Sequence, residues 1–139
     1  MNDVFSKEKR SEIMSHIRSK DTKPEIAVRK YLFSKGFRYR KNDKRYPGTP
    51  DIVLPKYKTV IFVHGCFWHG HEGCKYAIIP KTNTEFWIKK IEKNNDRDST
   101  NIEKLEKLGF MVIVIWECEL REHKDETLNK LVRKIRMKT

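Results

Sequence analysis

Three cysteines and one histidine form a candidate set of metal ligands. Cys66, His71 and Cys74 lie in one short segment, and Cys118 lies just beyond a strongly apolar one. Thiolates and imidazoles suit Zn²⁺, which takes four tetrahedral ligands in structural sites. The alternative is three buried free thiols beside a surface histidine, because the sequence contains no CxxC pair. The odd number of cysteines argues against a disulfide framework in either case.

A second group of residues can hold a hard cation and move a proton. Asp51 begins an apolar segment after a Gly-Thr-Pro turn, His64 follows directly on the next apolar segment, and His69 comes five residues later. A carboxylate at the start of one strand, beside a strand that ends in histidine, suits a divalent cation with a general base. As alternatives, Asp51 is an ordinary turn residue, and Glu25 is only the acid of a capping box that begins at Thr22.

An acidic residue lies on the expected buried face of a long helix. Asp98 comes seven residues after Ile91 and four before Ile102, which places the three on one face, and Asn94 falls there too. A buried carboxylate needs a partner. That partner is either a basic residue in a structural ion pair, or a catalytic histidine or metal ion that the acid orients or binds.

Large aromatic residues accompany these groups. Phe67 and Trp68 lie between the candidate ligands, and Trp87 lies at the start of the long helix. On a basic protein such side chains can insert between base steps of DNA. The alternative is that they cover the metal site as a small second core.

The charge balance points to a polyanionic partner. The 139 residues include 31 Lys and Arg against 19 Asp and Glu, and residues 1–50 supply +8 of the net +12. Nucleic acid is the commonest partner of such a chain. No apolar run approaches the ~20 residues of a membrane span, and the N-terminus lacks the apolar core of a signal peptide. We therefore expect a cytoplasmic protein without membrane contact.

The elements that must position these residues follow from apolar periodicity and from turn signals. Helices are predicted over residues 6–19, 23–35, 84–108 and 124–136, and strands over 37–40, 51–54, 59–63 and 111–116. The last strand reads as buried on both faces. Residues 64–83 have no periodicity, and an ordered loop of that length is usually functional. The order predicts a single α/β domain over 1–139, a mixed sheet flanked by helices, with a basic N-terminal helical arm at 1–20 and a catalytic core at 21–139.

Five long motifs together resemble one known family. They lie at residues 15–25, 47–53, 60–71, 80–87 and 114–119, and the most specific is the Phe-Val-His-Gly-Cys-Phe-Trp-His-Gly run at 62–70. They resemble the very-short-patch-repair (Vsr) DNA mismatch endonucleases over about residues 10–122. The resemblance implies a restriction-endonuclease-like fold. It also implies nicking of one DNA strand 5′ to the thymine of T:G mismatches, which arise when 5-methylcytosine deaminates.

The resemblance also implies roles for the residues singled out above. Asp51 would bind catalytic Mg²⁺, with the backbone carbonyl of Val63 as a further ligand, and His69 would be the general base. His64 and Asp98 would form a second essential pair, and Glu25 would be an accessory acid. The expected DNA contacts are the intercalating Phe67, Trp68 and Trp87, with Lys90 and Asn94 at the mismatch. The structural Zn²⁺ would be held by Cys66, His71, Cys74 and Cys118.

Two departures from the expected patterns bear on these roles. The His71–Cys74 spacing is one residue longer than in some family members, which makes Cys74 the least certain ligand. The Glu-x-Lys of most restriction-like nucleases is absent, and Phe62-Val63-His64 stands in its place. The generic mechanism of the superfamily therefore does not transfer.

Other functions stay open on the sequence alone. They are a zinc-stabilised DNA-binding module without catalysis and a related nuclease of different specificity. Besides double-stranded DNA with a T:G mismatch, other mismatch-repair proteins are candidate partners.

Overall fold

The helix starts and stops follow the local sequence signals. A computed structural model describes residues 22–137, so the predicted arm at 1–20 and its helix at 6–19 lie outside the described residues. Helix α2 (Lys23–Ser34) begins where the Thr22 side chain accepts a hydrogen bond from the Glu25 N–H at 3.4 Å. Its chain then reverses at Gly36, whose φ of 89° is costly for other residues.

Helix α3 (Thr84–Lys107) is the long helix that the periodicity predicts. It is followed by Gly109, with φ of 91°. Helix α5 (Lys124–Met137) confirms the predicted C-terminal helix. The short helix α4 (Glu117–Glu122) was not predicted; at its start the Glu119 side chain accepts a hydrogen bond from the Trp116 N–H.

The strands form a mixed sheet, as expected. In the described part of the chain the order is β1 (Arg40–Lys41), β2 (Ile52–Leu54), β3 (Thr59–His64), β4 (Met111–Trp116). The first two pairings are antiparallel and β3–β4 is parallel, with His64 opposite Trp116. A short 3₁₀ turn at Pro55–Tyr57 joins β2 to β3 and confirms the predicted hairpin.

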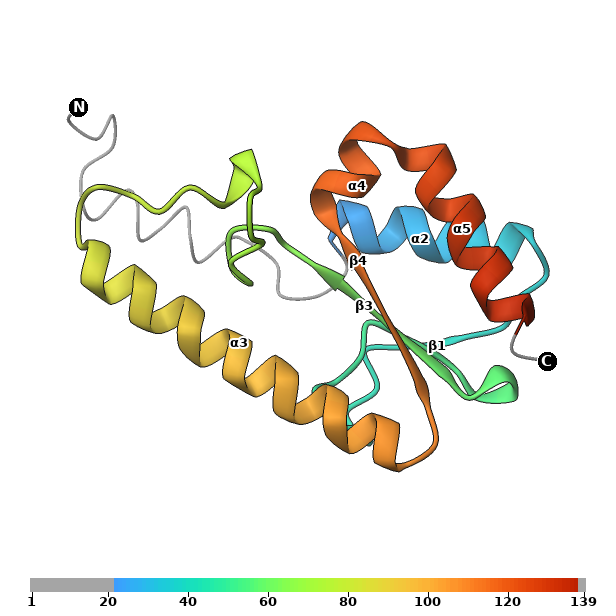
Figure 1. Ribbon diagram of the computed structural model, residues 1–139. Helices are drawn as coiled ribbons and strands as arrows, with labels where there is room; N and C mark the ends of the chain where they lie inside the picture. The colour runs from blue at the N-terminus through green and yellow to red at the C-terminus, as the bar shows by residue number, and fades with distance from the viewer. Residues whose placement is uncertain (1–21, 138–139) are drawn as a thin grey trace.

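Helices cover both faces of the sheet (Figure 1). One face carries Ile52, Ile61 and Ile113, which pack with buried residues of α2, α4 and α5. The other carries Val53, Val60 and Phe62, which pack with Leu105 of α3. The alternation along β3 divides its side chains between the two faces. Among residues 22–137, no helix is long and apolar enough to span a membrane.

Two expectations for the strands are wrong. The strand expected at residues 37–40 shrinks to Arg40–Lys41, because Phe37 packs into the core and does not pair. Strand β4 is not buried on both faces: Ile113 and Ile115 are buried, whereas Val112 and Val114 are only partly covered on the α3 side.

The sheet brings the chemistry-bearing residues together. Because β2 and β3 are antiparallel, the start of β2 lies beside the end of β3. Because β3 and β4 are parallel, their last residues, His64 and Trp116, lie at the same end of the sheet. The loop that follows β3 starts at this end, and so does α4 (Figure 1).

Candidate active site and metal centre

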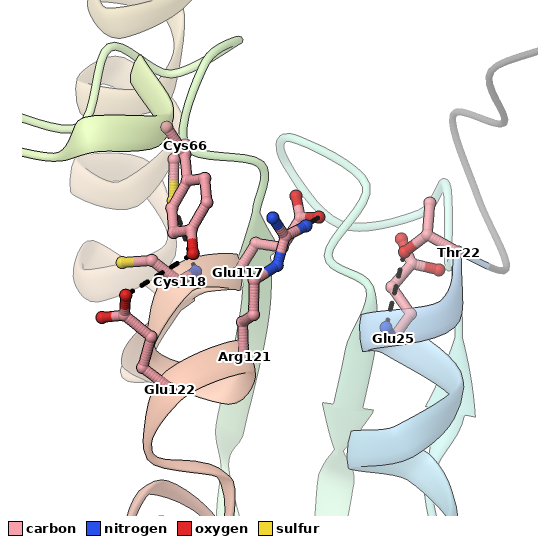
Figure 2. Close-up of polar contacts among 8 residues, drawn as sticks. Thr22, Glu25, Cys66, Glu117, Cys118, Arg121 and Glu122 are labelled. Carbon is pink, nitrogen blue, oxygen red and sulfur yellow. Dashed lines mark hydrogen bonds and ion pairs between the residues drawn. The ribbon is translucent and has the colours of Figure 1, made fainter. Parts of the chain in front are cut away.

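The four predicted soft ligands converge on one point. Cys66, His71 and Cys74 come from the loop after β3 and Cys118 from α4, and one donor atom from each lies within 4.8 Å of the others. The Cys118 Sγ is 3.4 Å from the His71 Nδ1. The Cys118 N–H donates to the Cys66 Sγ at 3.4 Å (Figure 2). The loop and the end of the sheet are thus joined through this Cys/His cluster.

The raised pKa values of two thiols bear on whether the cluster can hold a metal ion. Burial, together with the nearby thiols of Cys66 and Cys74, raises the pKa of Cys118 to about 12. Burial also raises the pKa of Cys66. Three thiolates this close repel one another unless a cation neutralises them. Three sulfurs and one imidazole nitrogen fit a single four-coordinate metal ion, so the Cys/His cluster can hold one.

Polar contacts reinforce the attachment of the loop to α4. The Arg121 guanidinium pairs with Glu117 at 3.0 Å (Figure 2). It also lies over the Tyr76 ring, 4.5 Å from the ring centroid. Lys75 pairs with Glu122 at 2.8 Å. These exposed contacts are individually weak. The Cys/His cluster is a further constraint on the loop's path.

Two carboxyl groups meet where β2 begins. The Asp51 Oδ2 accepts the Val63 N–H at 2.6 Å, and the Asp51 side chain also hydrogen-bonds the Glu25 carboxyl. Glu25 is only 2% exposed, and its Oε2 is 3.8 Å from the Arg29 Nη1. Glu25 thus has a role beyond helix capping, because its carboxyl faces Asp51.

Burial is the main reason that the pKa of Asp51 rises to about 8, and the Glu25 carboxyl adds to the shift. Near pH 7 and without a cation, the Asp51 carboxyl therefore favours its protonated form. A divalent cation would replace that proton and let Asp51 ionise. The acid pair and the adjacent backbone of Val63 form a site of hard oxygen donors.

His64 at the end of β3, His69 in the loop and Asp98 on α3 form a second group. The His69 Nδ1 is 2.5 Å from the Asp98 Oδ2, and the His64 ring stacks on the His69 ring at 3.7 Å with an interplanar angle of 1°. Among residues 22–137, Asp98 is therefore partnered by a histidine and not by Lys or Arg. A neutral His69 donates from Nδ1 to this carboxylate, which leaves Nε2 free to accept a proton.

The structure brings His64 and Asp98 together as expected, since one donor atom each of His64, His69 and Asp98 lies within 4.8 Å of the others, but among the described residues the hydrogen bond of Asp98 goes to His69. Asp98 bonds His69, which is more exposed, whereas His64 is 6% exposed and lies deeper against the sheet. Burial, and after it the charge of His69, lowers the pKa of His64 to about 4, so His64 is neutral near pH 7. The acid itself is half-buried and not enclosed.

The aromatic residues gather at the tip of the loop and the start of α3. Ring centroids of Phe67, Trp68 and Trp87 lie 5.1 to 5.9 Å apart. Phe86 joins them at 5.1 Å from Trp87 and is 58% exposed, although the sequence analysis did not single it out. The sequence signal that could have indicated Phe86 is that it directly precedes Trp87. Phe67, Trp68 and Trp87 are partly buried and Phe86 is exposed, so the four rings form a partly exposed aromatic patch.

The two residues expected at the mismatch lie on α3, one turn apart. Lys90 is exposed. Asn94 donates from Nδ2 to the Trp68 carbonyl at 2.8 Å and so holds the aromatic loop in place. The structure thus places Asn94 at the base of the loop and Lys90 beside it on the exposed side of the helix.

Comparisons with known proteins agree with this arrangement. A family model described as DNA mismatch endonuclease Vsr matches residues 2–75. The type II nicking enzyme V.NmeAIP of Neisseria meningitidis is 61% identical over 98% of both chains. The type II nicking enzyme V.XorIIP of Xanthomonas oryzae is 48% identical over 88% of this chain and 89% of its own. The DNA mismatch endonuclease Vsr of Escherichia coli is 45% identical over 87% of this chain and 77% of its own. With the family match across more than half of its residues and relatives along nearly all of them, the chain belongs to the family of Vsr DNA mismatch endonucleases.

Proposed function

We propose that the protein nicks one strand of duplex DNA, 5′ to the thymine of a T:G mismatch left by deamination of 5-methylcytosine, with Mg²⁺ as its cofactor. The observation that carries the proposal is that two pairs are attached to the end of β3: Asp51 of the acid pair accepts the Val63 N–H, and His69 of the His69–Asp98 pair stacks on His64. A protein that only bound DNA would need neither pair. Its DNA substrate makes the bacterial cytoplasm the proposed place of action.

The residues present suit hydrolysis of a phosphodiester. Cleavage needs a positioned water, a base that takes its proton, and positive charge near the phosphate. Asp51 and the Val63 carbonyl would hold Mg²⁺, which would stabilise the negative charge that develops on the phosphate. His69 takes the proton of the water at Nε2, and Asp98 keeps its ring in the required tautomer. Neutral His64 supports the ring of His69 by stacking on it.

The partly exposed aromatic patch supplies a means of finding the mismatch. A T:G pair is stacked less firmly than a matched pair, so that wedging it open costs less. Phe67, Trp68, Trp87 and Phe86 present flat apolar faces that can fill the opened step. The basic surface of the protein would hold the phosphates on both sides.

A panel of duplexes tests the proposed specificity. Wild-type protein with Mg²⁺ is incubated with otherwise identical duplexes that hold T:G, C:G, T:A or another mismatch, and the rate of strand breakage is measured. The proposal predicts rapid cleavage of the T:G duplex alone. Binding to T:G without cleavage of any duplex would favour a DNA-binding module, and equal cleavage of another mismatch would favour a nuclease of different specificity.

Replacing Cys118 tests whether the Cys/His cluster holds zinc. We propose Zn²⁺ as its ion, and we expect purified protein to carry about one zinc per chain, as structural sites do. Cys118→Ser should lose most of this zinc and melt at a lower temperature, because metal binding contributes to folding free energy. Elemental analysis and thermal melting measure both effects.

His123→Ala is the matched control for the zinc measurement. His123 is an exposed histidine near α4 that lies outside the Cys/His cluster. Its removal should change neither the zinc content nor the melting temperature. Fully active wild-type protein that contains no zinc would rule out the assignment.

Replacing Trp68 tests the proposed wedge. Trp68→Ala should weaken binding to a T:G duplex about 10- to 100-fold, since stacking on a base is worth about 1–3 kcal/mol. Binding to the matched duplex should fall much less, because a closed base step offers no face to stack on. Fluorescence titrations of both duplexes give the two dissociation constants.

Phe33→Ala serves as the control for loss of an exposed aromatic ring. Phe33 lies on α2 and is 56% exposed. The Phe33→Ala variant should leave both dissociation constants unchanged. Equal losses on matched and mismatched DNA for Trp68→Ala would show that the ring only packs the loop.

A further inference from the structure

Trp116 stands between the two chemical centres. It ends β4, opposite His64 in the parallel register, and Cys118 follows two residues later. Its backbone N–H donates to the Glu119 Oε1 at 2.9 Å, which fixes the turn from β4 into α4. The indole therefore projects from a firmly held backbone position.

The Trp116 ring contacts both centres. The His71 ring stacks flat on it at 4.0 Å with an interplanar angle of 5°. The His64 ring meets it edge-on at 5.2 Å and 73°, and the His69 ring lies 6.4 Å away at 74°. Within residues 22–137, no other ring contact joins the Cys/His cluster to the two catalytic histidines.

His64 depends on packing for its orientation. Rotation of an imidazole about its terminal torsion has broad minima, so neighbours decide the ring angle. Among the described residues, the buried Nδ1 of His64 has no hydrogen-bond partner. The ring is held instead by the faces and edges of Phe62, His69 and Trp116. Losing the flat indole would remove one of these three supports.

His69 is held from two sides. Asp98 fixes its Nδ1, and the parallel stack with His64 fixes the plane of its ring. A tilt of His64 would carry His69 with it or break the stack. Either outcome changes the direction in which the Nε2 of His69 accepts a proton, and catalysis is sensitive to displacements of this size.

We infer that Trp116 is a positioning residue, which braces the His64–His69 stack against the Cys/His cluster and so keeps His69 aligned with Asp98. The effect on turnover rests on the proposed function, since His69 acts there as the base. Through Trp116, the Cys/His cluster, which could hold a metal ion, would also support the geometry of the catalytic pair. Trp116 itself touches no reacting atom.

Two replacements of Trp116 separate positioning from simple filling of space. Trp116→Phe keeps a flat ring, and Trp116→Leu keeps apolar volume without one. We expect Trp116→Leu to lower single-turnover nicking of a T:G duplex about 10- to 100-fold, the range typical of groups that orient a functional residue. Its dissociation constant for the duplex should not change, and Trp116→Phe should restore most of the rate.

A spectroscopic measurement makes the test independent of nicking. The proton between the His69 Nδ1 and the Asp98 Oδ2 should give a far-downfield proton NMR signal in wild-type protein, assigned by its loss in Asp98→Asn. Trp116→Phe should retain this signal and Trp116→Leu should broaden or lose it. If wild-type protein fails to nick DNA, the proposed function fails, while the NMR signal still decides the role of Trp116.

Phe110→Leu is the matched control. Phe110 is a partly buried ring that packs edge-on against Tyr46 on the α3 side of the sheet. Its removal should leave the NMR signal and the rate unchanged. If Trp116→Leu does not fold or does not retain the zinc, Trp116→Met replaces it. The inference is overturned if the folded, zinc-containing aliphatic variant keeps either the NMR signal or the wild-type nicking rate.

Discussion

The Asp51→Asn variant is expected to bind a T:G duplex as tightly as wild-type protein but to nick it slower by several orders of magnitude. Asparagine keeps the size of the side chain and an oxygen that can accept the Val63 N–H. It removes the negative charge that would hold Mg²⁺. A metal ion contributes several kcal/mol to the transition state, and about 4 kcal/mol corresponds to roughly a thousandfold in rate.

The fold should survive this replacement. Burial and the Glu25 carboxyl raise the pKa of Asp51 to about 8, so without a cation the site already favours an uncharged side chain. The amide resembles that uncharged form. Affinity should also survive, because it comes mainly from basic contacts to phosphates. Single-turnover nicking and a binding titration on the same preparation measure the two effects.

Asp125→Asn is the control for loss of one negative charge. Asp125 is exposed in the first turn of α5, outside the acid pair. It should nick DNA at the wild-type rate. Were Asp51→Asn to do the same, Asp51 would have no part in the chemistry, and most of the proposed mechanism would fall with it.

Removing either member of the His69–Asp98 pair is expected to slow nicking about 10²- to 10⁴-fold, the usual contribution of a positioned general base. His69→Ala removes the base, and Asp98→Asn removes the group that sets its tautomer. Because the two act as a unit, the double variant should be little slower than His69→Ala alone. Single-turnover rates of the three variants test this non-additivity.

His123→Ala and Asp96→Asn are the paired controls for these replacements. Both residues are exposed, and Asp96 lies on the same helix as Asp98. Neither should change the rate. If the losses of His69→Ala and Asp98→Asn multiply in the double variant, the two residues act separately and the short contact between them is not part of the mechanism.

Local sequence signals were enough to predict much of the fold. The cap at Thr22, the glycines at 36 and 109, and the apolar segments of β2, β3 and β4 each act over a few residues. The convergence of the Cys/His cluster was predictable for a different reason. Few chemistries use three cysteines and a histidine in this way, so residue type restricted the possibilities before any distance was known.

The details of the catalytic pair depended on three-dimensional packing. Periodicity placed Asp98 on the inner face of α3 but could not tell which histidine it meets. That choice depends on the path of the loop, which the Cys/His cluster fixes from outside the helix. The positioning role of Trp116 could not be predicted from the sequence for a similar reason. Its neighbours in sequence are those of a buried strand, whereas its functional neighbours come from the loop after β3.

Strand-resolved mapping of the cut tests the central claim most directly. A T:G duplex is labelled separately on each strand, incubated with wild-type protein and Mg²⁺, and resolved on a denaturing gel against sequence markers. The account predicts one break, in the thymine strand, on the 5′ side of the mismatched thymine, with the opposite strand intact and no break when Mg²⁺ is chelated. Cleavage of both strands, a cut at another position, or equal cleavage without Mg²⁺ would contradict it.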